Sequence, residues 1–383
     1  MTTALISGAG VAGPALAYWL HRYGFDVTLV ESARGIRTGG YPIDVRGPAV
    51  QVAAWMGVLP ELRAAHIDTR RISVVNATGR TVASLSPGEL AAGNSNDDIE
   101  IPRGQLGEIL YGLTRNRIEY VFGDSVATLD QHPGGVDVTF EHGAPRTFDH
   151  VIGADGLHST TRRLAFGPKR DYHHYLGYCF AGFEVANTGG LSHEALLQNT
   201  PGRLAALYAV GDAPEKIHAL LAYATPEPTP RESVTARVRE VFAGLGGETP
   251  RLLDALEQAD DLYSDTVSQI RMPAWTTGRV SLLGDAAYAP SFLTGQGTTL
   301  ALVGAYLLAQ NLGDSNAYEQ AMRGYVTRTQ TLGRGPAMIV PRTGTELWLR
   351  NQAFRLMPLL SRFHRRSTPP AGITLPEPVK MDA

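Results

Sequence analysis

Residues 4–20 read ALISGAGVAGPALAYWL, a G-x-G-x-x-G run set between a short apolar strand and a predicted helix. A second apolar run, VTLV at residues 27–30, ends in Glu31. A strand, a glycine-rich turn, a helix and a second strand that ends in an acid form, in this order, the βαβ unit that binds dinucleotides. The amino-terminal stretch therefore predicts a Rossmann-type α/β domain.

The glycine-rich turn predicts a site for a pyrophosphate. Its cofactor-contacting residues are Gly8, Gly10, Val11, Ala12 and Gly13. Glycines permit a tight turn and a close approach of the backbone to phosphates, and the helix that follows presents unpaired N–H groups and a positive dipole end. Glu31 can accept hydrogen bonds from both hydroxyls of an adenosine ribose and disfavours a 2′-phosphate. We therefore expect this site to hold FAD or NAD rather than NADP.

Length and composition exclude several classes of protein. The chain has 383 residues, a formal net charge of −3 and one cysteine, Cys179. This charge does not favour a nucleic-acid partner, and a single cysteine allows neither an internal disulfide nor a cysteine-rich metal site. Residues 2–20 carry no charged side chain, but their glycines and proline do not fit a signal peptide or a membrane anchor. We therefore expect a cytoplasmic protein with no metal site and no membrane partner.

Two further motifs each follow a stretch that predicts a strand. DGLHSTTR, residues 155–162, comes directly after a short apolar run. GDAAYAP, residues 284–290, follows a second apolar run and continues to GQG at residues 295–297. Because a helix is predicted over residues 298–312, the GQG run stands at the start of a helix.

With these three motifs in order, the chain resembles the single-component FAD-dependent aromatic hydroxylases of the p-hydroxybenzoate hydroxylase type. The resemblance covers residues 1–312. Within that group the chain looks most like the tetracycline-inactivating monooxygenases, or tetracycline destructases. The stretches that carry this closer likeness are VAGP at 11–14, AYWL at 17–20, GG at 39–40, DVRG at 44–47 and GDAAY at 284–288.

The resemblance implies further contacts to a non-covalent FAD. Asp285 would accept hydrogen bonds beside the ribityl chain and pyrophosphate, and Arg103 would balance the diphosphate charge from the far side. The N–H groups of Gly295, Gln296 and Gly297 would face the N1–C2 carbonyl edge of the flavin, where negative charge develops on reduction. The other implied contacts are Arg37 to the cofactor, Arg46 and the Gly39-Gly40 loop along the isoalloxazine, and Asp155 with Gly156 for both FAD and NAD(P)H. Arg162 would anchor that segment.

The sequence departs from this family at two positions. The wider family usually has His where Tyr288 stands and Pro where Phe292 stands, whereas Pro290 is kept. Phenylalanine lacks the fixed φ of proline but adds a large apolar face. We therefore predict that Phe292 and Pro290 contact the substrate, with Phe180 and Phe183 behind them.

The predicted fold is α/β, a Rossmann-type FAD-binding domain with a β-sheet substrate domain and a C-terminal helical region. Residues 118–122, 136–140 and 147–152 predict a β-meander, because turn residues separate the three runs. The expected division is 1–70, 100–171 and 273–330 for the FAD-binding domain, 71–99 and 172–272 for the substrate-binding domain, and 331–368 for the C-terminal helices. Residues 369–383 are expected to form a tail that is disordered or loosely packed.

The resemblance also implies a reaction. NADPH or NADH would reduce FAD, and the reduced flavin would form a C4a-hydroperoxide with O2 and oxygenate an aromatic or polycyclic phenol or enol, such as a tetracycline-like or aromatic polyketide compound. No catalytic side chain is expected, since the flavin carries the chemistry. Two alternatives stay open. One is a flavoprotein that binds and sequesters such a ligand without turnover. The other is a flavin-dependent halogenase, which the wide separation of the four tryptophans disfavours.

Overall fold

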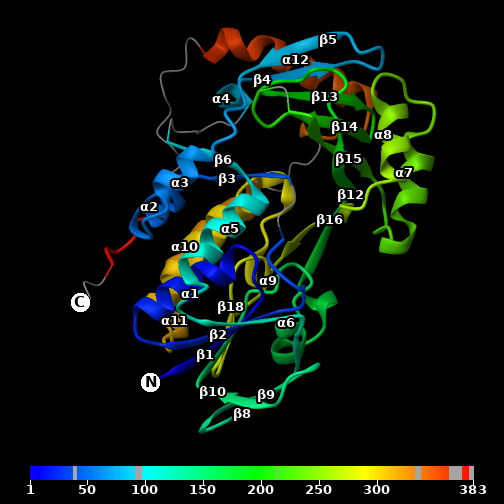
Figure 1. The fold of residues 1–383 in the computed structure, drawn as a ribbon. Coiled ribbons are helices and arrows are strands. Elements are labelled where there is room, and N and C mark those ends of the chain that lie inside the picture. The colour runs from blue at the N-terminus through cyan, green and yellow to red at the C-terminus, as the bar shows by residue number, and fades with distance from the viewer. Residues whose placement is uncertain (38–40, 91–96, 213, 333–337, 362–372, 379–383) are drawn as a thin grey trace.

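The computed structural model describes residues 1–37, 41–90, 97–212, 214–332, 338–361 and 373–378. Two large β-sheets with their covering helices form the two parts of the molecule, and two smaller sheets, one of three strands and one of two, accompany them. The strands β12 (His173–Ala186) and β16 (Tyr263–Ile270) reach from the second large sheet toward the first (Figure 1). The predicted α/β fold class, with a second part built on a β-sheet and helices toward the C-terminus, is confirmed.

A six-stranded sheet forms the first part. Its order is β17-β18-β11-β1-β2-β7, and its described pairs are parallel except for β17 with β18. The glycine-rich turn follows the carboxyl end of β1, which is an inner strand of this sheet. Open α/β sheets bind ligands at the carboxyl ends of their strands. The strands are β1 (Thr3–Ser7), β2 (Asp26–Glu31), β7 (Glu119–Phe122), β11 (His150–Gly153), β17 (Thr276–Thr277) and β18 (Val280–Leu282).

Helices on one face of this sheet enclose the main core. α1 (Ala12–Arg22) packs on α10 (Gly297–Gln310) and on α5 (Arg103–Thr114). α10 is buried at every position from Thr298 to Ala309, as expected for a helix that is apolar on all sides. The other helices of this part are α2 (Pro48–Trp55), α3 (Leu59–Ala64), α6 (Thr160–Phe166), α9 (Asp285–Tyr288) and α11 (Ser315–Leu332).

A three-stranded antiparallel sheet covers the opposite face of the first sheet. Val136, Val138 and Phe148 of this small sheet pack against Leu5 and Val151 of the large one. Its order is β10-β9-β8. The strands are β8 (Val126–His132), β9 (Gly135–Phe140) and β10 (Arg146–Phe148).

The predicted β-meander is therefore wrong in two of its three runs. The run at 118–122 is β7, which pairs with β2 in the six-stranded sheet. The run at 147–152 is split at Asp149 between β10 and β11, which belong to different sheets. The Asp149 carboxylate accepts hydrogen bonds from the N–H (2.8 Å) and the hydroxyl (3.0 Å) of Thr3, so this residue binds the start of β1 where the chain changes sheet.

A seven-stranded sheet forms the second part, in the order β16-β12-β15-β14-β13-β4-β5. One face packs on α7 (Val234–Phe242) and α8 (Thr249–Leu256). The other face carries Phe180 and Leu204 toward Phe292. The strands are β4 (Arg71–Val75), β5 (Thr81–Leu85), β12 (His173–Ala186), β13 (Glu194–Thr200), β14 (Arg203–Tyr208), β15 (Lys216–Ala224) and β16 (Tyr263–Ile270).

The C-terminal helix α12 (Gly344–Ser361) lies along β5 (Figure 1), and its Phe354 packs against Ala83 and Leu85 of that strand. Residues 373–378 return to α10, where Leu375 is buried and the Tyr306 hydroxyl donates to the Pro376 carbonyl (2.6 Å). This part of the predicted loose tail is therefore packed, and the rest of 369–383 lies outside the described residues. The remaining short elements are β3 (Pro42–Val45), β6 (Ile99–Pro102), α4 (Pro87–Leu90), η1 (Lys169–Asp171), η2 (Arg231–Ser233) and η3 (Phe292–Thr294).

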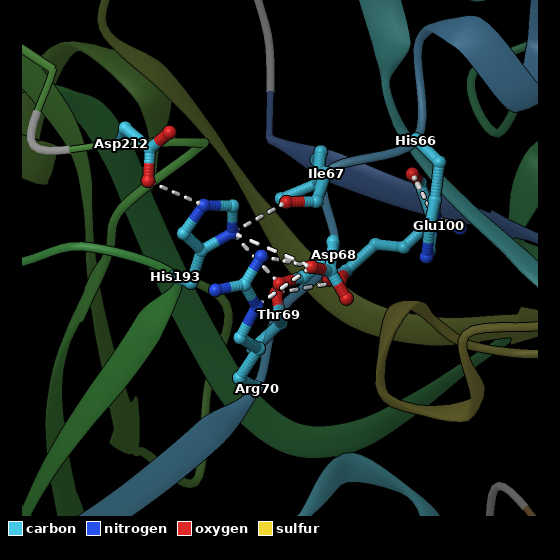
Figure 2. Close-up of polar contacts among 8 residues, drawn as sticks. All are labelled: His66, Ile67, Asp68, Thr69, Arg70, Glu100, His193 and Asp212. Atoms are coloured by element: carbon cyan, nitrogen blue, oxygen red, sulfur yellow. Dashed lines mark hydrogen bonds and ion pairs between the residues drawn. The ribbon is translucent and has the colours of Figure 1, made fainter.

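The chain crosses between the two parts at a polar joint (Figure 2). Segment 66–70 runs from α3 into β4, and the His193 ring lies against it from the loop before β13. His193 Nδ1 is 2.9 Å from the Asp68 carbonyl oxygen, and Nε2 is 2.9 Å from the Asp212 carboxylate. These contacts attach the crossing segment to the edge of the second sheet. Within the described ranges, no helix combines the length and the apolar character needed to cross a bilayer.

Candidate functional site

Segments far apart in the sequence meet at the carboxyl ends of β1, β11 and β18. Gly8, with φ +109°, lies so close to the end of β11 that a Cβ on it would be 2.6 Å from the Ala154 carbonyl oxygen. Gly284, with φ +64°, brings the start of α9 against α1, where a Cβ would be 3.1 Å from Ala12 Cβ. Both positions require glycine, and together they assemble the three motifs into one site.

The turn after β1 has the form of an anion site. Gly13 packs on Gly8, since a Cβ on Gly13 would be 1.9 Å from the Gly8 carbonyl oxygen. Gly10 is the opposite case, because no heavy atom of the described residues lies within 4 Å of the position that its Cβ would take. No described side chain caps the start of α1, and its first turn has no acid. The open space at Gly10 therefore adjoins uncapped N–H groups, and a diphosphate fits there.

Glu31, at the end of β2, braces this turn. Its Oε2 accepts a hydrogen bond from the Ala9 N–H, and its Oε1 accepts one from the Ala33 N–H, each at 2.8 Å. The Ser32 hydroxyl also donates to Oε1 (3.2 Å). A carboxylate oxygen can accept a second hydrogen bond, so Oε2 keeps capacity for a ribose hydroxyl. The bracing role was not expected from the sequence, and the ribose contact stays a prediction.

Arg162 connects the second motif to the third. It is 1% exposed and donates hydrogen bonds to the carbonyl oxygens of Leu157 and Ala286, both at 2.8 Å. Ser159 is the N-cap of α6, and Asp155 supports the same end, because its carboxylate accepts hydrogen bonds from the N–H (2.9 Å) and hydroxyl (3.0 Å) of Thr161. Asp155 is thus occupied within its own segment, and its contact with a nucleotide stays a prediction.

Asp285, at the start of α9, and Arg103, at the start of α5, lie close enough for their charges to interact. The Asp285 side chain is exposed to solvent. The protein atoms packed around it still desolvate the carboxyl and raise its pKa. Exposure and crowding are both expected for a side chain in a recess that water can enter. The Arg103 guanidinium opposes this rise in pKa, and the Asp265 carboxylate adds to it. A recess that holds a carboxylate and a guanidinium suits a ligand with hydroxyl and phosphate groups, which FAD has.

The start of α10 adjoins Asp285. Its N-cap is Gln296, no side chain among the described residues caps it, and its first turn has no acid. A Cβ on Gly297 would be 3.8 Å from Asp285 Oδ1. Gly295 has φ +61°, and a Cβ there would be 2.8 Å from Asp44 Oδ2. The helix therefore presents its N–H groups and positive dipole end beside Asp285, which fits the predicted role of the GQG run.

Arg46 is paired with an acid. Its guanidinium is 2.8 Å from Asp44 Oδ2, and its backbone N–H donates to Thr299 Oγ1 of α10 (3.2 Å). Burial raises the pKa of the Asp44 carboxyl despite this neighbour. Arg37 is exposed, and the Gly39-Gly40 loop lies outside the described residues. The contact of Arg37 with the cofactor and that of Arg46 with the flavin ring stay predictions.

Four aromatic rings lie together near this recess, and we call Tyr41, Phe180, Tyr263 and Phe292 the aromatic wall. Phe292 stacks on Phe180 with ring centroids 4.3 Å apart and meets Tyr41 edge-on at 4.8 Å. Tyr263 is 5.7 Å from Phe180 and 6.1 Å from Tyr41. Phe292 begins η3, which leads through Gly295 to the start of α10 beside Asp285, so the wall lies next to the recess. Rings with polar hydroxyl ends suit an aromatic ligand.

The four predicted substrate contacts do not all lie at this wall. Phe292 and Phe180 belong to it, and Pro290 is buried just before Phe292. Phe183 was expected behind them, but it packs on the other face of the second sheet, against α7 and α8. The prediction for Phe183 is wrong because side chains alternate along a strand, so positions 180 and 183 point to opposite faces.

Sequence reasoning missed Tyr41, Asp44, Tyr263 and Asp265. Asp265, on β16, lies 3.0 Å from His158 Nε2 and so connects the second sheet to the second motif. Asp44 lies inside the quoted DVRG run. An acid two residues before an arginine was a signal in the sequence that could have indicated their ion pair. The other three residues lie in no motif, so only the fold brings them to the site.

Tyr288, which departs from the wider family, faces the core. It is 1% exposed, and its hydroxyl is 3.0 Å from the Tyr318 hydroxyl. Gly304 of α10 makes room for it, since a Cβ there would be 2.0 Å from the Tyr288 hydroxyl oxygen. Tyr288 therefore acts in packing, behind the segment that leads to Phe292.

Comparison with known proteins points to one family. The profile of the family described as FAD binding domain matches residues 1–324. A flavin-dependent monooxygenase from an unknown prokaryotic organism is 37% identical over 340 residues, which cover 86% of this chain and 88% of the relative. Tetracycline destructase Tet(55) superimposes with a TM-score of 0.79 and 34% identity, covering 92% of this chain and 95% of its own. Tetracycline destructase Tet(51) gives 0.82 and 29%, covering 98% and 100%.

Proposed function

Because this chain belongs to the FAD-binding domain family and is an FAD-dependent monooxygenase, we propose that it uses NADPH or NADH and O2 to hydroxylate or otherwise oxygenate an aromatic or polycyclic phenol or enol. A tetracycline-like or aromatic polyketide compound is the proposed substrate class. The observation that carries this proposal is the aromatic wall beside the recess of Asp285 and Arg103. The similarity to two tetracycline destructases supports this substrate class.

The fit of the glycine-rich turn and of α10 supports specific roles toward FAD. When bound, FAD supplies the electron transfer and the activation of O2. The space at Gly10 and the start of α1 receive the diphosphate, with Arg103 as its counter-charge. Asp285 accepts hydrogen bonds from ribityl hydroxyls. The start of α10 would offer its positive dipole end to the negative charge that a bound flavin gains on reduction.

The aromatic wall orients the substrate and keeps water away from it. Phe292 and Phe180 offer flat apolar faces, and an aromatic pair contributes about 0.5–1.5 kcal/mol beyond the area that it buries. Burial raises the pKa of Tyr41 to about 12. Tyr263 is 40% exposed, and the protein atoms packed around it still raise the pKa of its phenol. Both phenols therefore stay protonated at neutral pH, and they can donate hydrogen bonds to an enolate or phenolate oxygen of the substrate.

Turnover separates this proposal from a flavoprotein that only binds and sequesters its ligand. We expect NAD(P)H oxidation by the FAD-loaded protein to accelerate with at least one member of a panel of tetracyclines, anthraquinones and simple phenols. The product should be heavier than the ligand by one oxygen atom. The measurement is NAD(P)H absorbance with O2 uptake, followed by mass spectrometry. Ligands that bind but leave the rate unchanged would contradict oxygenation and support sequestration.

A further inference from the structure

Two glutamine side chains hold the backbone that leads to Phe292. Gln269 lies on β16 with no exposed surface, and Gln330 lies in the last turn of α11. Gln269 Nε2 donates hydrogen bonds to the carbonyl oxygens of Pro290 (2.9 Å) and Gln330 (2.6 Å). Arg271 Nε donates to Gln269 Oε1 (3.0 Å), which fixes the orientation of the amide and turns its N–H groups toward Pro290.

Gln330 completes the arrangement from the helix. Its Nε2 donates to the Ile270 carbonyl oxygen (2.7 Å) and lies 3.3 Å from the carbonyl oxygens of Tyr288 and Ala289. The Ile270 N–H also donates to the Ala289 carbonyl (3.1 Å). Three consecutive carbonyls, at positions 288–290, are therefore held by one strand and one helix that are distant in the sequence.

The residue that follows these carbonyls has an unfavourable backbone conformation. Ser291 has φ +101° and ψ 139° and is 4% exposed. A residue other than glycine keeps such a conformation only where its surroundings over-determine it. The hydrogen bonds to carbonyls 288–290 supply that constraint on the N-terminal side. Phe292 comes next, and Gly295 to Gly297 lead into α10, so this conformation sets where the loop meets the recess.

We propose that Gln269 and Gln330 are positioning residues for oxygenation, which act through the backbone of 288–290 to set the place of Phe292 and the start of α10. This inference rests on the proposed function. Gln269 lies on the same sheet as Phe180 and Tyr263, and it binds the backbone that leads to Phe292. Its hydrogen bonds therefore fix the position of Phe292 relative to the other rings of the aromatic wall. A buried amide whose N–H groups all find carbonyl acceptors favours one backbone arrangement, which an apolar side chain of equal size does not specify.

The test replaces the amide without emptying its space. Gln269→Met removes both hydrogen bonds to backbone carbonyls and keeps a similar volume. Gln198→Met is the matched control, because Gln198 is also buried in the second sheet and its Nε2 donates to a backbone carbonyl, that of Gly246 (3.0 Å), on the α7–α8 side. Three quantities are measured on FAD-loaded protein: deuterium uptake of the peptide covering 286–297, the Kd for FAD, and H2O2 released per NAD(P)H oxidised.

In Gln269→Met we expect amide exchange in 286–297 to accelerate about tenfold, as for the loss of one to two net hydrogen bonds. The share of NAD(P)H that ends as H2O2, with O2 reduced and no oxygen transferred, should rise severalfold. The Kd for FAD should change less than threefold. Gln198→Met should change neither exchange in this peptide nor the H2O2 yield.

Equal behaviour of the two variants in exchange and in H2O2 yield would overturn the inference and leave Gln269 a packing residue. If Gln269→Met does not fold, Gln330→Met carries the same test, since it removes the donors to Ile270, Tyr288 and Ala289. If the parent shows no ligand-stimulated turnover, the proposed function fails. Exchange in 286–297 and the visible spectrum of bound FAD then still decide whether the two glutamines position the loop.

Discussion

Gly10→Ala is expected to leave the protein folded and to weaken FAD binding on the order of 100-fold, about 2.7 kcal/mol, because a methyl group would fill the space proposed for the diphosphate. Gly10 lies outside the left-handed region, and no heavy atom of the described residues is within 4 Å of its Cβ position. The FAD-free protein therefore has no steric reason to lose stability. The measurements are the Kd for FAD and the melting temperature of the FAD-free variant.

Two other glycines make this result specific. Gly13→Ala places a Cβ 1.9 Å from the Gly8 carbonyl oxygen, so it should lower the melting temperature as well as FAD affinity. Gly189→Ala, in the loop before β13, also meets open space among the described residues and should change neither. If Gly10→Ala bound FAD as tightly as the parent, the diphosphate would have to lie elsewhere.

Phe292→Ala is expected to weaken binding of an aromatic substrate roughly 10- to 30-fold while changing the Kd for FAD less than threefold. Phe292 makes two ring contacts in the aromatic wall, with Phe180 and Tyr41, and its removal also takes away a stacking face for the ligand. A 10- to 30-fold change corresponds to about 1.4–2 kcal/mol, which two aromatic contacts of about 0.7–1 kcal/mol each supply. The Kd values for substrate and FAD, together with the H2O2 yield, are the measurements.

Phe292→Pro and Phe183→Leu are its controls. Proline suits the first position of η3, so Phe292→Pro should preserve the loop, lose the ring and change which substrate is preferred. Phe183 lies on the opposite face of β12. Phe183→Leu should therefore lower the melting temperature but leave substrate binding intact. Substrate affinity and H2O2 yield equal to those of the parent in both Phe292 variants would make Phe292 a loop-packing residue.

Local patterns in the sequence were enough to predict the elements that build the cofactor recess. The order of strand, glycine run, helix and strand predicted β1, α1 and β2, because each step depends on neighbouring residues only. The run at 298–312 likewise predicted α10, whose start at Gly297 is within one residue of the expected position. The second and third motifs depend on strands that end at the same edge of the sheet, so their meeting could be anticipated.

Features that depend on non-local pairing could not be predicted in this way. The split of 147–152 between two sheets requires the contact of Asp149 with Thr3, which nothing near Asp149 in the sequence indicates. The assignment of Phe183 failed because aromatic content does not say which face of a strand a residue occupies. Gln269 and Gln330 carry no motif, and their joint action appears only when β16 and α11 are placed together.

The central claim is that this chain transfers one atom of O2 to an aromatic or polycyclic substrate. Its most direct test is the mass of the product formed by FAD-loaded protein with NAD(P)H under ¹⁸O₂, paired with the same reaction in H₂¹⁸O under unlabelled O2. We expect one ¹⁸O atom in each product molecule from the gas and none from the water. Label that arrives from water instead, or a ligand recovered unchanged while NAD(P)H is consumed, would contradict it.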